Sequence, residues 1–138
     1  MGLPERRFWH QWQAVISFLR AHNVSLVLAE FGPTGAALRA ICKAEGIPLV
    51  VNFHGYDATV MPRRADIRAA YGLLARDAAG FLCGSQHFRG TVAGAGIPQD
   101  RITVIPCGVY TSDFRAASDR AGNRLVAVGR LTPKKAPL

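Results

Sequence analysis

The sequence predicts an α/β protein with a Rossmann-like parallel sheet and helices on both faces. Short apolar segments alternate along the chain with longer segments in which apolar residues recur at helical spacing. With 138 residues, of which 49% are hydrophobic and 19% charged, the chain has enough apolar side chains for a packed core. Such alternation is typical of βαβ units, whose right-handed crossovers place helices against the sheet.

The first part of the chain predicts helix, strand and helix in turn. Residues 5–22 have one apolar helical face, formed by Phe8, Trp12, Val15, Ile16 and Leu19. Residues 25–31 form a short apolar run, which predicts a buried strand. Residues 33–46 predict a helix, with Pro33 in its first turn and Gly46 at its end.

The same alternation continues to the end of the chain. It predicts helices at residues 63–80 and 85–96 and strands at residues 48–53, 80–84, 100–106 and 124–129. Ser85 is predicted to cap the helix that it precedes. Residues 107–123 have no steady period and predict a connecting segment.

Parallel sheets bind ligands beyond the carboxyl ends of their strands. This rule selects the segments that follow the predicted strands, at residues 30–35, 54–57, 84–87, 106–110 and 129–135. The first of these segments contains "GPTGAA" (32–37), whose backbone N–H groups at a helix start could face an anion. The chain has neither the GxGxxG spacing of a nicotinamide-binding turn nor the GxxxxGK[ST] of a P-loop.

His54 follows the strand at 48–53, and Gly55 and Asp57 come directly after it. A histidine at this edge can donate to a substrate hydroxyl or stabilise developing charge. A histidine that only bonds a loop carbonyl is the alternative. Ser85, which follows another strand, raises a hydrolase hypothesis, but the Gly-x-Ser-x-Gly spacing of a nucleophile elbow is missing.

Composition and charge narrow the function further. No apolar run is long enough to span a membrane, and the first residues do not have the pattern of a secretory signal, so a cytoplasmic location is expected.

Cys42, Cys83 and Cys107 lack metal-ligand spacing and are predicted to be buried free thiols. The net charge of +8 favours an anionic partner, or it belongs to a solvated basic surface. Nucleic acid is not expected, because the phenylalanines lie in apolar runs rather than among cations.

Arg130 follows the last predicted strand, and Lys135 comes five residues later, where a helix would begin. A planar guanidinium and a mobile ammonium could together hold a diphosphate at this position. By itself the R-x4-K spacing favours two solvated loop cations.

Three segments in order resemble the GT-B glycosyltransferases of the large family 4. They are "VVNFHGYD" (50–57), "FLCGSQHFRGTVAGAGIPQDRITVIPCGVYTSDF" (81–114) and "LVAVGRLTPKKAP" (125–137). The resemblance implies two Rossmann-like domains with the active site between them. It implies transfer of a sugar from a nucleotide-sugar to an acceptor, with retention of anomeric configuration and without a metal or cofactor.

The resemblance also implies roles for particular residues. His54 would be the catalytic residue near the transferred sugar, and Arg130 and Lys135 would bind the donor diphosphate. Further candidate substrate contacts are Gly55, Asp57 and Gly108. The acceptor stays open between a saccharide, a lipid-linked group and a small molecule. A non-catalytic module that binds a nucleotide or another polyanion is the alternative function.

The same resemblance divides the chain into a partial acceptor-side domain (1–109), a connection (110–123) and the start of a donor domain (124–138). It implies truncation at both ends and no transfer by the isolated chain. Tyr110 and Ala136 stand where the family usually has Asp and Gly. The first helix, with Arg6 and Arg7, either packs on the core or touches the inner face of a membrane.

Overall fold

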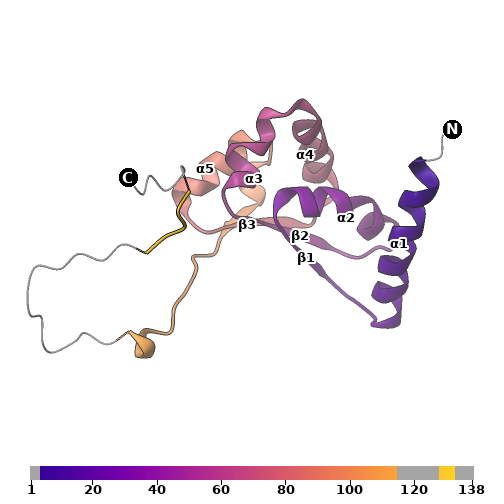
Figure 1. The fold of residues 1–138 in the computed structure, drawn as a ribbon, viewed down its shortest axis with the longest axis horizontal. Helices are drawn as coiled ribbons and strands as arrows, with labels where there is room; N and C mark the ends of the chain where they lie inside the picture. Colours follow the sequence, from indigo (N-terminus) through magenta and orange to yellow (C-terminus); the bar gives the residue numbers. More distant parts are fainter. Residues whose placement is uncertain (1–3, 115–127, 133–138) are drawn as a thin grey trace, which may run out of the picture. The chain divides into compact units, whose positions relative to one another are not determined.

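A computed structural model describes residues 4–114 and 128–132, with side chains described from Trp12 onward. The chain divides into two units, residues 1–107 and 108–138. Every α-helix and β-strand of the described residues belongs to the first unit (Figure 1). None of the described helices is long and apolar enough to cross a membrane.

The first unit is built on a four-stranded parallel sheet, as predicted. Its strands lie side by side in chain order: β1 (Val27–Glu30), β2 (Leu49–Phe53), β3 (Gly80–Cys83) and β4 (Ile102–Val104). The register places Glu30 of β1 opposite Asn52 of β2, and Asn52 opposite Leu82 of β3. All four strands therefore present their carboxyl ends at one edge.

The main helices form one layer on one face of this sheet (Figure 1). They are α2 (Gly32–Ala44), α4 (Ala65–Asp77) and α5 (Gln86–Gly94). Since the strands follow one another in chain order, each right-handed crossover places its helix on the same face. These three helices therefore lie on the same face, and the fold class itself, a Rossmann-like parallel sheet with helices, is as predicted.

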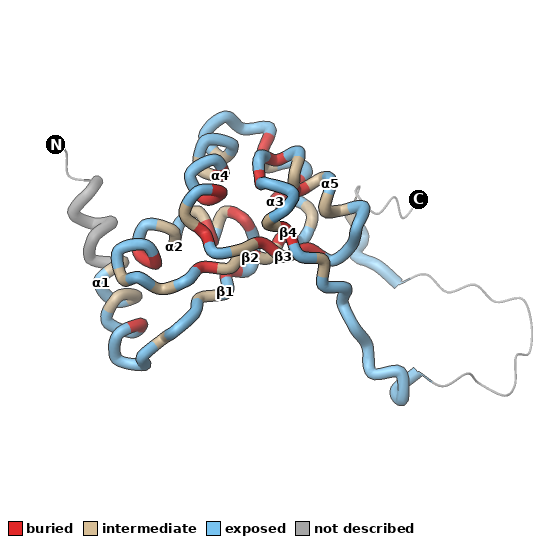
Figure 2. The backbone as a smooth tube through the Cα atoms, turned by 180° about the vertical axis from the view of Figure 1, so that it is seen from behind, coloured by how far each residue is buried: buried red, intermediate tan, exposed pale blue. Residues whose placement is uncertain are grey.

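The core lies between the sheet and this helical layer (Figure 2). The strand side chains that point into it are almost wholly buried: Leu49, Val51, Phe53, Phe81, Cys83 and Ile102. On the opposite face Leu28 is 49% exposed. The strand predicted within residues 25–31 exists, but only one of its faces is buried.

Helix α1 (Pro4–Ala21) has a side that faces the protein. Leu19 is buried, and Trp12, Val15 and Ile16 are partly buried. Arg20 pairs with Glu45 at the end of α2, with 2.6 Å between Nε and Oε2. These contacts support packing on the protein over the described part of the helix. The side chains of Phe8, Arg6 and Arg7 lie outside the described residues.

Local signals predict several element ends well. Gly46 follows α2 with φ +67°, and the Ser85 hydroxyl accepts a hydrogen bond (3.1 Å) from the Phe88 N–H as the N-cap of α5. The helix predicted from residue 63 begins only at Ala65. A 3₁₀ turn (Met61–Arg63) and the short helix α3 (Tyr56–Thr59) precede it, and neither was predicted.

The second unit is described over residues 108–114 and 128–132 and contains a 3₁₀ turn, Thr111–Asp113. The strand predicted at residues 124–129 is not formed at Val128 and Gly129, and its other residues lie outside the described ranges. The predicted domain limits at residues 109 and 124 therefore stay predictions.

Candidate functional site

His54 is the first residue after β2, at the carboxyl edge of the sheet. Its side chain is 41% exposed. The chain turns sharply at Gly55, whose φ of +138° is a conformation that residues with a side chain rarely adopt. Helix α3 begins at the next residue, so the turn leaves the imidazole at the edge while the chain continues into the helical layer.

The side chain of Asp57 stabilises this turn by hydrogen bonds to its backbone. Its side chain is almost wholly buried (2% exposed). Its Oδ1 atom accepts hydrogen bonds from the backbone N–H groups of Gly55 (2.8 Å) and His54 (3.1 Å). Its Oδ2 atom accepts a hydrogen bond from the N–H of Gly32 (3.0 Å), at the start of α2. Asp57 therefore ties together the loops that follow β1 and β2. A carboxylate engaged in this way holds the backbone that carries His54.

Tyr71 of α4 completes the buried network. Its hydroxyl donates to the backbone carbonyl of Asp57 (2.8 Å), and its ring packs edge-on against Phe53, with centroids 5.5 Å apart. Burial, and to a lesser extent the nearby charge of Asp57, raise the pKa of Tyr71 far above its ordinary value. A Cβ at Gly32 would lie 2.3 Å from the Tyr71 hydroxyl, so only glycine fits there.

On its exposed side His54 contacts the end of β1. Its Nε2 atom hydrogen-bonds Glu30 Oε2, and the amide of Asn52 donates to the same oxygen (3.1 Å). Because an ionised carboxylate only accepts, Nε2 carries the proton in this contact. The hydrogen bond from His54 lowers the pKa of Glu30. The ring of Phe31 lies beside the imidazole, with centroids 4.6 Å apart.

Glu30, Phe31 and Asn52 were not predicted as site residues. The strand-end rule selects the segment 30–35 as a whole, but no local pattern distinguishes Glu30 and Phe31 within it. Their contact with His54 depends on the register that sets Glu30 opposite Asn52. Only that register could have indicated these residues, and the register is a property of the folded sheet that no local sequence motif specifies.

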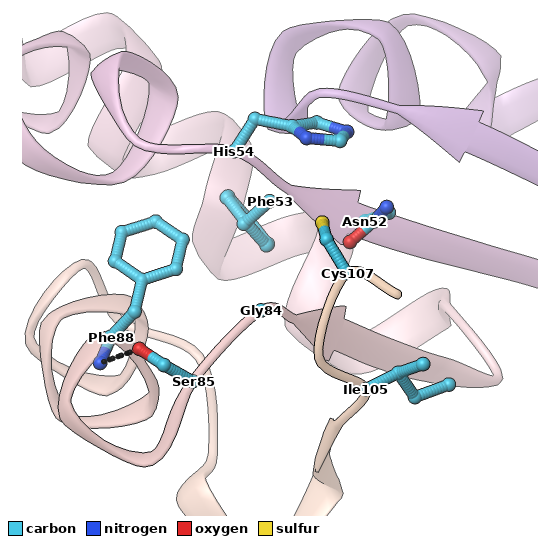
Figure 3. Close-up of a pocket in the computed structure, with 8 residues that line it drawn as sticks. All are labelled: Asn52, Phe53, His54, Gly84, Ser85, Phe88, Ile105 and Cys107. Carbon is cyan, nitrogen blue, oxygen red and sulfur yellow. Dashed lines mark hydrogen bonds between the residues drawn. The ribbon is translucent and has the colours of Figure 1, made fainter. Parts of the chain in front are cut away.

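A hollow of about 230 Å³ opens beside His54 where β2, β3 and β4 end (Figure 3). It is lined by Asn52, Phe53, His54, Gly84, Ser85, Phe88, Ile105 and Cys107. Pockets that enclose a whole small ligand usually measure about 300–1,000 Å³. This hollow therefore suits one part of a ligand, such as a single ring, rather than a whole nucleotide-sugar.

The predicted site residues fall into three groups. The structure brings His54, Gly55 and Asp57 together in one turn of the first unit. Gly108 and Arg130 are exposed residues of the second unit. Lys135 lies outside the described residues. The roles of all six in substrate binding stay predictions.

The cysteines are free thiols, as predicted, but they are not all buried. Cys42 and Cys83 are buried, and burial raises the pKa of the Cys42 thiol. Cys107 is exposed and lines the hollow. Within the described ranges no three histidine, cysteine or acidic side chains are grouped so as to hold a metal ion.

The fold and the carboxyl edge of its sheet together define a Rossmann-like domain with a candidate ligand site. A four-stranded parallel Rossmann-like sheet carries a fixed, exposed histidine and a hollow at the carboxyl ends of its strands. Residues 2–113 match the family model described as Glycosyltransferase Family 4, and the chain belongs to this family. A comparison with curated proteins finds none that matches.

Proposed function

We propose that the chain takes part in the retaining transfer of a sugar from a nucleotide-sugar to an acceptor, with His54 at the reacting centre. The observation that carries this proposal is the position of His54. It is exposed at the ligand-binding edge of the sheet, beside a hollow, and a buried carboxylate fixes its backbone. In a chain of this family, such a rigidly held histidine is best explained by contact with substrate.

The imidazole has a defined hydrogen-bonding direction. In a neutral imidazole that donates Nε2–H to Glu30, the Nδ1 atom has a lone pair and can accept a hydrogen bond from a sugar hydroxyl. If substrate displaces Glu30, Nε2–H becomes the donor instead. In both arrangements His54 orients the transferred sugar or stabilises charge that develops as its bond to the donor breaks.

The donor side of the proposal rests on Arg130 and Lys135. A guanidinium can grip two phosphate oxygens at once, and a nearby ammonium neutralises the diphosphate as it departs. This role follows from the resemblance of "GRLTPKK" to the family pattern. The nucleotide-sugar is a substrate here, and no metal or other cofactor is part of the proposal.

The first test is turnover. The polypeptide that carries this sequence, purified at its natural length, would be incubated with labelled nucleotide-sugars and a mixed panel of acceptors. Transfer with the same anomeric configuration in product and donor, determined by NMR, is the expected result. Inverted products would refute retention, and no transfer from any common nucleotide-sugar would refute the proposal.

The net charge of +8 favours a second candidate function, in which the chain is a module that binds a nucleotide or another polyanion without catalysis. It predicts binding without turnover. Such binding should weaken steeply with salt, because phosphate contacts release counterions. Calorimetric titration of a nucleoside diphosphate at two salt concentrations, beside the turnover assay, distinguishes the two functions.

A further inference from the structure

We propose that Phe31 is a platform on which a pyranose ring of the acceptor stacks, so that the acceptor at this edge is a saccharide. This inference rests on the proposed function and narrows it, because sequence alone leaves saccharide, lipid and small-molecule acceptors open. It is carried by the exposure of Phe31, by its backbone conformation and by the polar groups around it.

Phe31 does not contribute a core side chain. Its side chain is half exposed (50%), and it is absent from the hydrophobic core cluster. Its backbone has φ +74° and ψ +139°, a region that favours glycine. The Phe31 N–H donates to the Asn52 carbonyl (2.9 Å), and the Phe31 carbonyl accepts from the Gly35 N–H (3.1 Å).

These two backbone bonds impose the conformation, and the fold would be served at least as well by glycine. A phenylalanine in such a position holds an apolar ring at the surface against the preference of the backbone. Strained residues of this kind are concentrated at ligand sites, where the side chain has a role that stability does not explain. Here the ring lies at the carboxyl edge of the sheet, beside His54.

The groups around the ring match a sugar rather than a lipid chain. A pyranose presents a face of C–H bonds, which packs on the negative face of an aromatic ring, and hydroxyls at its rim. The His54 imidazole adjoins Phe31, and its Nε2 contacts Glu30. Glu30 Oε1 accepts no hydrogen bond from the described residues, so it can accept one from a hydroxyl. A hydrocarbon chain here would strip water from the Glu30 charge without replacing it.

The direct test is saccharide binding. Saturation-transfer NMR of the purified chain with maltose, cellobiose, lactose and chitobiose should show contact with the ring protons of at least one disaccharide. Phe31→Ala and Phe31→Gly should weaken that binding at least tenfold, while Phe31→Trp should retain it. Thermal melting checks folding, and Phe31→Gly is expected to melt no lower than wild type.

Phe18 offers a matched control. It is also an exposed phenylalanine (59%), and its ring lies 4.4 Å from that of His22, in a similar tilted geometry, but on α1. Phe18→Ala removes the same ring and the same kind of histidine contact away from the strand ends, so saccharide binding should not change. Equal binding by Phe31→Ala and Phe18→Ala, or no disaccharide contact in the wild type, would overturn the inference.

A second measurement separates this inference from the proposed function. In the polypeptide of natural length, Phe31→Ala should raise the KM for a saccharide acceptor at least tenfold, whereas Phe18→Ala should leave that KM unchanged. Transfer with an unaltered acceptor KM would refute the stacking role while the transferase function stands. If the polypeptide transfers no sugar but still binds a disaccharide through Phe31, the transferase function is refuted and the stacking role stands.

Discussion

The carboxylate of Asp57 occupies the place at the start of α2 where the sequence leads one to expect a bound anion. The glycine-rich segment "GPTGAA" predicts N–H groups that face a negative charge, and the Gly32 N–H does so. The charge comes from the protein itself, 25 residues further along the chain. Asp57 thus holds the turn that carries His54, and its contact with a substrate stays a prediction.

Asp57→Ala should lower the free energy of unfolding by about 2–4 kcal/mol, because it leaves several backbone N–H groups without their acceptor. Urea unfolding measures this loss. Asp66→Ala is the matched control, since Asp66 is exposed and pairs with Arg64 on the surface, so it should change the free energy of unfolding much less than Asp57→Ala does. Equal losses for the two variants would mean that the Asp57 network stabilises nothing.

The Glu30–His54 contact predicts a pH effect. The pKa of Glu30 is lowered, chiefly by the hydrogen bond from His54, so the contact is fully present above the ordinary glutamate pKa of about 4.3. It is lost as the pH falls through the lowered value of the folded protein. In His54→Ala the titration midpoint of Glu30, followed by carboxyl-carbon NMR, should move upward. An unchanged midpoint would show that the contact does not form in solution.

At the scale of elements, the helices were predictable because their apolar residues recur at a steady spacing. The end of α2 and the cap of α5 followed from Gly46 and Ser85. The exposed face of β1 was not predictable, because a short apolar run looks the same whether one or both faces are covered. The short helix α3 was missed because its four residues, "YDAT", carry no periodic signal.

The packing of α2 on the sheet depends on Gly35. A Cβ at Gly35 would lie 2.5 Å from Cγ2 of Val51, too close for an ordinary contact. Gly35→Ala should therefore lower the free energy of unfolding by about 1–3 kcal/mol through overpacking.

Gly72 of α4 provides the matched control for this substitution. Nothing lies within 4 Å of a Cβ at that position, so Gly72→Ala should stabilise the helix by about 0.5–1 kcal/mol. Thermal and urea unfolding of both variants test the pair. The same sign of change for the two would contradict the packing described for α2.

At the scale of the whole molecule, the alternation of elements and the strand-end rule predicted the parallel sheet and the edge that carries the site. They could not predict that α2, α4 and α5 lie on one face, because this depends on strand order. They also could not pair Glu30 with His54, since the two are 24 residues apart and meet only through the sheet register.

The family itself was predicted from motifs in their order along the chain, and the family match over residues 2–113 confirms it. The two cations assigned to the donor were predicted from the same order of motifs. Arg130 belongs to the second unit and Lys135 lies outside the described residues, so their role awaits experiment.

The most direct test of the account is the effect of His54→Ala on sugar transfer by the polypeptide of natural length. We predict a fall in kcat/KM of about 100-fold or more, with little change in melting temperature, because the imidazole acts on the substrate and the backbone network remains. His22→Ala, which removes an exposed histidine from the other end of the unit, should leave kcat/KM unchanged. If both variants transfer sugar at the wild-type rate, His54 is not at the reacting centre and the central claim is wrong.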